Sequence, residues 1–176
     1  MGRLANVGVF ETILKRRSIR KFKADAVGRE PLEKLLEAAR WAPSAGNLQP
    51  WVFVVVTSAE VREALAAAAY GQRFVAEAPA VIAVVAAPPK DSPYGRRGRE
   101  LYCLQDTAAA VQNVLLTAYE LGLGTCWVGA FDEEAAAQAL RLEAGERPVA
   151  LVPVGVPARE GRSSRRPLAE VVRWME

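Results

Sequence analysis

Three runs of consecutive apolar, mostly β-branched or alanine residues restrict what this chain can fold into. They are WVFVVV at residues 51–56, AVIAVVAA at 80–87 and VALVPVGV at 149–156. None of them alternates apolar with polar side chains, so each predicts a strand that is covered on both faces. Ala-rich segments with helical spacing separate the runs. We therefore expect an α/β or α+β layer fold with one sheet buried between helices.

The segments between these strands complete the outline. Helical spacing predicts helices over 6–15, from Pro31 to before Pro43, over 61–69, over 100–121, and after Asp132. Thr57 and Glu60 fit a capping box at the start of the helix over 61–69. Residues 125–131 predict a short strand or extended loop, 88–99 a mobile surface loop, and 167–174 a short helix or arm. The helix over 100–121 is apolar on more than one side, which favours a subunit interface.

Length and composition predict an ordinary globular protein. The chain has 176 residues, 51% hydrophobic and 24% charged, and shows no linker or repeat, so we expect one domain over 1–176. No apolar run reaches the roughly 18 residues of a membrane helix, and the first residues do not resemble a signal peptide. These features predict a cytoplasmic protein without a membrane partner.

The chain contains no histidine and only two cysteines, Cys103 and Cys126. This excludes Ser-His and Cys-His catalysis and the commonest zinc ligand. The cysteines lie in apolar stretches without a CxxC spacing and predict buried free thiols. We expect no catalytic side chain and no metal site, and if the protein is an enzyme, a cofactor carries the chemistry.

Positive charge is concentrated near the two ends of the chain. Residues 15–23 hold six of the 23 lysines and arginines and no acid, and residues 159–166 hold four with one acid. Such runs are as often a solvated surface as a binding site. Arg16, Ser18 and Arg20 share a face if helical spacing persists, and such a set suits a phosphate. A basic nucleic-acid-binding module is the competing interpretation, but Phe22 is the only aromatic residue in the cluster.

Two further segments carry groups suited to a flat heterocycle. Residues 43–51 (PSAGNLQPW) offer Ser, Asn and Gln side chains that donate and accept hydrogen bonds, although turn chemistry alone explains such residues. Residues 121–131 (LGLGTCWVGAF) hold glycines that allow a ligand close to the backbone. Their Gly-x-Gly lacks the rest of a dinucleotide fingerprint, so it does not predict a Rossmann site.

Taken together and in this order, the segments resemble the nitroreductase family of FMN-dependent NAD(P)H oxidoreductases. The similarity runs through RRSIRKF, APSAGNLQPWVFVVV, GLGTCWVGAF, VPVGVP and RRPLAEVV. It implies an α+β fold with a central, mostly antiparallel sheet flanked by helices. It also implies an intertwined homodimer with two FMN sites in the interface.

The resemblance also assigns cofactor-binding residues. Arg16, Arg17, Ser18 and Arg20 match the N-terminal FMN segment, and Trp127, Val128 and Gly129 match the loop over the flavin near N5. The partner subunit would supply the segment that here comprises Pro43, Ser44, Ala45, Asn47 and Gln49. Arg165 and Arg166 match a C-terminal cation at the phosphate. Gln72 stands where the family often has an Asn and a Lys before the second strand.

The implied activity is hydride transfer from NAD(P)H, through flavin N5, to nitroaromatic, quinone or similar small-molecule acceptors by a ping-pong mechanism. A specialised flavin dehydrogenase or dehalogenase, or a flavin-binding protein without turnover, would use the same fold. The family's well-studied flavin reductases are longer, with a helical excursion over the active site. Here residues 88–99 are all that corresponds to such a lid, which favours an open, permissive site.

Overall fold

A four-stranded antiparallel sheet forms the centre of the computed structural model, which describes residues 8–176. The strands are β1 (Trp51–Val56), β2 (Ala80–Ala86), β3 (Gly124–Thr125) and β4 (Arg147–Gly155). Their order across the sheet is β1-β2-β4-β3. Phe53 faces Val84 across the first pair of strands, and Ile82 faces Val152 across the second.

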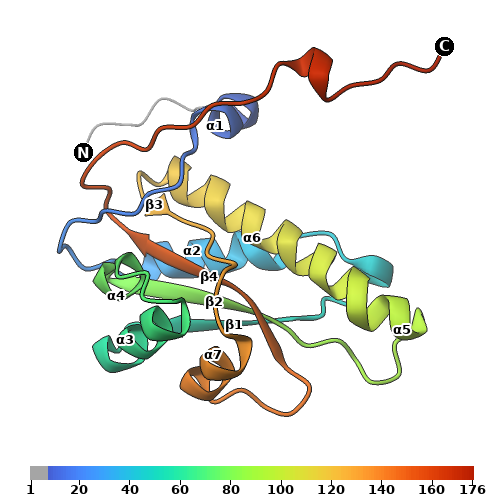
Figure 1. Cartoon of the computed structure of the whole chain (residues 1–176), viewed down its shortest axis with the longest axis horizontal. Helices are drawn as coiled ribbons and strands as arrows, with labels where there is room; N and C mark the ends of the chain where they lie inside the picture. The colour runs from blue at the N-terminus through green and yellow to red at the C-terminus, as the bar shows by residue number, and fades with distance from the viewer. Residues whose placement is uncertain (1–7) are drawn as a thin grey trace.

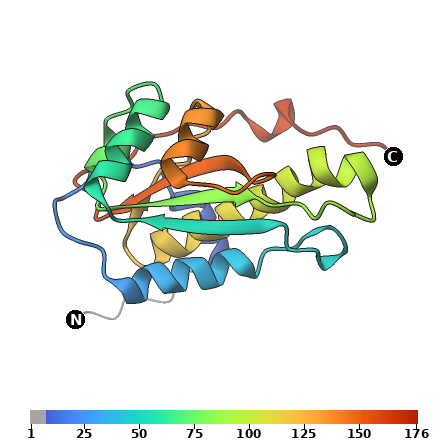
Figure 2. The same cartoon turned by 90° about the horizontal axis from the view of Figure 1, so that it is seen from below.

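Two layers of helices cover the sheet, one on each face (Figure 1, Figure 2). The helices are α1 (Val9–Lys15), α2 (Arg29–Arg40), α3 (Ala59–Ala68), α4 (Phe74–Glu77), α5 (Gly95–Arg97), α6 (Cys103–Glu120) and α7 (Glu133–Leu140). Three short turns are η1 (Ala45–Asn47), η2 (Gly98–Tyr102) and η3 (Leu168–Glu170). Figure 2 shows α2 and α6 on one face and α3 and α7 on the other.

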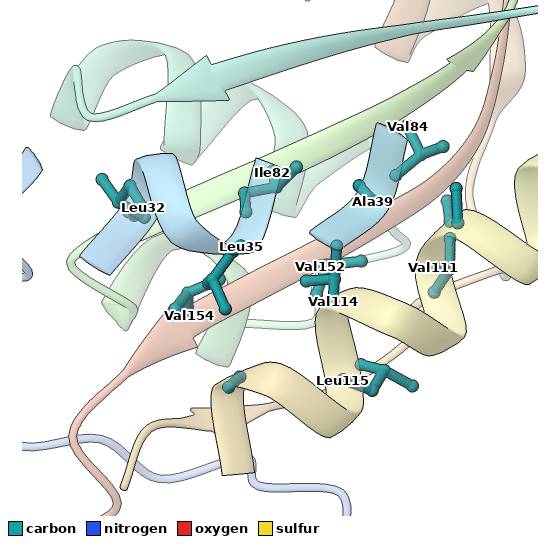
Figure 3. Packing of buried hydrophobic residues seen from close by; sticks show 14 of the residues in the cluster. Leu32, Leu35, Ala39, Ile82, Val84, Val111, Val114, Leu115, Val152 and Val154 are labelled. Atoms are coloured by element: carbon teal, nitrogen blue, oxygen red, sulfur yellow. The ribbon is translucent and has the colours of Figure 1, made fainter. Parts of the chain in front are cut away.

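The unbroken apolar runs are explained by this double cover. Ile82 and Val84 of β2 pack with Val152 against α2 and α6, where Leu35 and Val114 are fully buried (Figure 3). The intervening residues of the same strands point the other way, toward α3, α4 and α7. Because both faces of the sheet pack against apolar helices, the side chains of β2 and of the centre of β4 are apolar on both faces. The α+β architecture and the antiparallel sheet confirm the fold expected from the sequence.

Local boundaries differ from the predictions in three places. The predicted N-cap at Thr57 is wrong by one residue. The N-cap is Ser58, whose side chain accepts a hydrogen bond from the backbone N–H of Val61. Residues 88–99 are not all loop, because helical turns begin at Gly95 and continue through η2 into α6. The short helix α4 was not expected at all. None of the helices in residues 8–176 is long and apolar enough to cross a membrane.

Candidate functional site

The N-terminal cationic segment lies along the short strand β3. Ser18 forms a parallel bridge with Thr125, and the N–H of Ile19 donates to the Thr125 carbonyl at 2.8 Å. This approach requires Gly124, because a Cβ there would stand 2.8 Å from a side-chain carbon of Ile19. The structure therefore brings together the first and third segments that the sequence singled out.

Cations surround two adjoining hollows on this edge of the molecule. The hollow of about 640 Å³ is lined by Ser18, Arg20, Arg159 and Arg162, and its neighbour of about 470 Å³ by Lys15, Arg16 and Arg17. Glu160 is the only acid among the described residues that line them. Such an excess of positive charge in one concavity favours an anionic ligand.

Arg16 is the arginine most affected by this crowding. Burial lowers the pKa of its guanidinium below the ordinary value, and the positive charges of Arg165 and Arg17 lower it further. The interaction with Arg165 shows that the C-terminal segment returns to the N-terminal one, as Figure 1 also shows near α1. An anion between these groups would relieve their repulsion and hydrogen-bond to them.

Two other arginines are engaged within their own segments. The Arg17 guanidinium donates to the backbone carbonyls of Leu14 and Arg16, where it caps the end of α1. Arg166 donates to a Glu170 carboxylate oxygen at 3.1 Å. Contacts of either side chain with a ligand stay predictions.

Arg20 and Gln72 both lie beside the loop after β3. The Arg20 guanidinium lies 5.8 Å from the ring centre of Phe74 in α4, a cation–π contact that the sequence did not suggest. Gln72 donates from its side-chain amide to the Ala130 carbonyl at 3.1 Å. Gln72 therefore tethers the loop of residues 126–131, whether or not it also touches a ligand.

Within that loop, neighbouring residues have different surroundings. Cys126 is buried, which raises the pKa of its thiol, while Arg20, Ser18 and Arg16 beside it act in the opposite direction. The N–H of Val128 donates to Leu151 at 2.9 Å, so it is occupied. Trp127 is 40% exposed. Gly129 is also exposed, and no backbone hydrogen bond found in residues 8–176 uses its N–H.

The remaining predicted segment, residues 43–49, lies at the other end of α6. Ala45 donates its N–H to Asp106 in the first turn of α6, whereas Tyr119 near the end of that helix lines the hollow with Arg16. From Asp106 to Tyr119 the helix rises about 20 Å, at about 1.5 Å per residue. The structure does not bring Ser44, Asn47 or Gln49 to the cationic hollows of the same chain.

This loop has an unusual backbone. Gly46, Asn47 and Gln49 adopt φ values of +57°, +55° and +51°, in the left-handed region. The Ser44 hydroxyl accepts from the N–H of Gln49 at 3.0 Å, and the side-chain amide of Gln49 donates to the Asn47 carbonyl at 3.3 Å. The fold presents this strained, polar loop outward, since Asn47 and Gln49 are both exposed.

Sequence reasoning missed Asp106 as a partner of this loop. A signal was present, because Asp106 lies on the buried stripe of α6 with Cys103, Ala110 and Val111. A charged residue on such a stripe needs a polar partner. Nothing in the sequence identified that partner, which is 61 residues away.

Comparison with known proteins gives the family. The profile of the nitroreductase family matches residues 13–73 and 66–156. A Thermus thermophilus protein named NADH dehydrogenase is 38% identical, with 92% of this chain and 93% of the relative covered. A Desulfovibrio desulfuricans protein solved in complex with FMN is 37% identical, covers 96% of each chain, and superposes with a TM-score of 0.83.

The NADPH:FMN oxidoreductase of Vibrio harveyi, solved with NAD⁺, superposes with a TM-score of 0.86 at 26% identity. The superposition covers 96% of this chain and 77% of the Vibrio protein, which is therefore the longer of the two. The family profile, the related sequences and the superposed structures all identify the same family. The chain belongs to the nitroreductase family.

Proposed function

We propose that this protein is a homodimeric FMN-dependent oxidoreductase that takes hydride from NAD(P)H. Nitroaromatics, quinones or similar flat acceptors then receive it in a second half-reaction at the same open face. The observation that carries the proposal is the position of Arg16, which lines a cationic hollow with Arg17, has Arg165 nearby, and lies beside Cys126 at the start of the loop of residues 126–129. The FMN and NAD⁺ complexes of relatives support it.

The residues present fit an FMN. Its phosphate needs cations and hydroxyls, and the hollows supply Arg16 and Ser18, with Arg165 close to Arg16. Negative charge develops on the pyrimidine end of the flavin when it is reduced, and a cation there stabilises it. Arg20, two residues after Ser18 in the N-terminal cationic segment, is the candidate for this role. FMN, when bound, supplies the hydride chemistry at its N5 atom.

The protein's own part is to bind and orient. The exposed Gly129 N–H, which no backbone acceptor in the described chain occupies, is suited to donate to a flavin ring atom. The occupied Val128 N–H and the Gln72 tether fix this loop before any ligand arrives. The chain contains no histidine, so no imidazole takes part in proton transfer to the acceptor.

The two ends of α6 support a dimer with shared sites. The loop of residues 43–49 and the cationic hollows of the same chain lie at opposite ends of α6, and an antiparallel partner would bring this loop to the hollows of the other chain. Large apolar side chains are exposed on α1 and on the C-terminal arm. They are Val9, Phe10 and Leu14 on α1, and Leu168, Val171 and Trp174 on the arm. A second copy that covers these side chains would explain their exposure.

Flavin binding and turnover test the proposal together. The purified protein should be yellow or take up added FMN, and NADH or NADPH should bleach the flavin absorbance. We expect the Arg16→Ala variant to weaken FMN binding about 10- to 100-fold, because it removes a charge-assisted bond to the phosphate. Arg29→Ala, which removes an exposed arginine paired with Glu33 on α2, is the matched control and should bind as wild type.

Separate outcomes identify the alternatives. A protein that stays colourless with excess FMN contradicts the proposal, and steeply salt-dependent DNA binding would then favour a nucleic-acid module. Binding without reduction by either nicotinamide would indicate a flavin-binding protein without turnover. Reduction with poor turnover of quinones and nitroaromatics would indicate a specialised dehydrogenase or dehalogenase.

A further inference from the structure

Asp106 is a buried carboxylate at the base of the loop of residues 43–49. It is 8% exposed and lies on the face of α6 that packs into the protein. Its Oδ1 accepts the N–H of Ala45 at 3.1 Å, the one side-chain hydrogen bond found for this group in the described residues. Keeping a carboxylate in such surroundings costs free energy unless the acceptor is used. The fold therefore retains a buried carboxylate whose single hydrogen-bond partner in the described residues is the loop backbone.

The loop needs such an anchor because most of its other bonds are internal. Asn47 and Leu48 donate their N–H groups to the carbonyls of Ser44 and Ala45, and Gln49 donates to the Ser44 hydroxyl. These bonds fix the shape of the loop but not its position on the protein. Between its two ends, the attachments found in the described residues are the hydrogen bond to Asp106 and the ring of Tyr94, which lies against Gly46.

The geometry points to Asp106 as a positioning residue for flavin binding. Its bond to the N–H of Ala45 holds the loop of residues 43–49 in the position in which Ser44, Asn47 and Gln49 contact the flavin of the partner subunit. This inference rests on the proposed function, since it assumes an FMN site shared between two chains. It goes beyond that function, because the role assigned to Asp106 is to hold the loop backbone and not to contact the cofactor.

Two substitutions remove the bond from its opposite sides. Asp106→Leu removes the acceptor while it keeps a side chain branched at the same atom. Ala45→Pro removes the donor, and the backbone tolerates it, because Ser44 before it is extended (φ −144°, ψ 152°) and Ala45 is the first residue of η1. Asp106→Asn keeps an oxygen that can accept the Ala45 N–H and serves as the conservative variant. Thr107→Val is the control, since Thr107 is also buried but its hydroxyl donates within α6 to the Cys103 carbonyl at 2.8 Å.

The measurements are FMN affinity by titration, the visible circular dichroism of the bound flavin, and the melting temperature without FMN. We expect Asp106→Leu and Ala45→Pro each to weaken FMN binding about 10- to 100-fold and to change the flavin dichroism. The double variant should lose no more than either single variant, because both remove the same bond. Asp106→Asn should recover most of the affinity, and Thr107→Val should stay within about twofold of wild type while its melting temperature falls.

The possible results separate this inference from the proposed function. A wild-type protein that fails to bind FMN contradicts the proposed function. Wild-type affinity and dichroism in Asp106→Leu or Ala45→Pro overturn the positioning role alone, and so does an equal loss of affinity in Thr107→Val. If Asp106→Leu does not fold, Ala45→Pro and Asp106→Asn decide the question by the same criteria.

Discussion

At Gly46 the chain has no room for a side chain. A Cβ there would stand 2.7 Å from the Tyr94 hydroxyl oxygen, and φ is +57°. Gly71 has a similar backbone, with φ of +76°, but nothing lies within 4 Å of its missing Cβ. The two glycines thus separate the cost of a left-handed backbone from the cost of a steric clash.

We expect Gly46→Ala to lower the free energy of unfolding by about 2–4 kcal/mol, from backbone strain and overpacking together. Gly71→Ala should cost only about 1–2 kcal/mol, from the backbone alone. Denaturant unfolding of both variants measures the difference. Equal losses would show that Tyr94 moves away freely, whereas recovery of part of the Gly46→Ala loss by Tyr94→Ala would confirm the clash.

At the scale of elements, the C-terminal arm combines two features that lie next to each other in sequence. Arg165 stands close enough to Arg16 to lower its pKa, while Leu168, Val171 and Trp174 beyond it are exposed. In Figure 1 the end of the arm extends past α1 and away from the body. The first part belongs to the cationic hollows, and the second part is a surface for another copy under the proposed function.

Two truncations should separate these parts. Removal of residues 167–176 should weaken the dimer, measured by sedimentation, because it deletes the exposed apolar side chains and leaves Arg165 in place. Removal of residues 165–176, which keeps Arg162 of the hollow, should in addition weaken FMN binding at least about tenfold, because it deletes Arg165, a phosphate ligand under the proposed function. Arg165→Ala in the full chain should reproduce that additional loss. Equal FMN affinities of the two truncated proteins would contradict the role of Arg165.

The elements that the sequence predicted are those whose signal is local. The runs at 51–56 and 149–156 and the periodic helix over 100–121 depend on packing that their own residues specify. The strand β3 has only two residues and depends on Ile19 packing over Gly124, so its extent was not predictable. The contacts of Gln72 with Ala130 and of Asp106 with Ala45 join residues 58 and 61 positions apart. One sequence shows that such groups exist but not which of them meet.

At the scale of the whole molecule, the central issue is which flavin each segment serves. Mixed dimers decide it, with one chain carrying Arg16→Ala and the other Asn47→Gly. Glycine removes the Asn47 amide and adopts φ +55° without steric cost. If sites are shared, one site of each mixed dimer carries both defects and the other carries none.

We therefore expect mixed dimers, isolated through two different affinity tags, to hold about half the FMN of wild type with wild-type affinity. Dimers of either variant alone should bind weakly at both sites. If Arg16 and Asn47 of one chain served the same flavin, every site in the mixed dimer would carry one defect and no tight binding would appear. That result would refute the shared sites and leave the family assignment intact.

The length of α6 has a last consequence, for how the protein should behave on dilution. If the groups that hold one flavin come from opposite ends of this helix in two chains, cofactor occupancy and association are linked equilibria. Added FMN should then lower the dissociation constant of the dimer, and dilution should release FMN from protein that was saturated when concentrated. At the low protein concentrations of a rate assay, specific activity would fall with enzyme concentration unless free FMN is supplied.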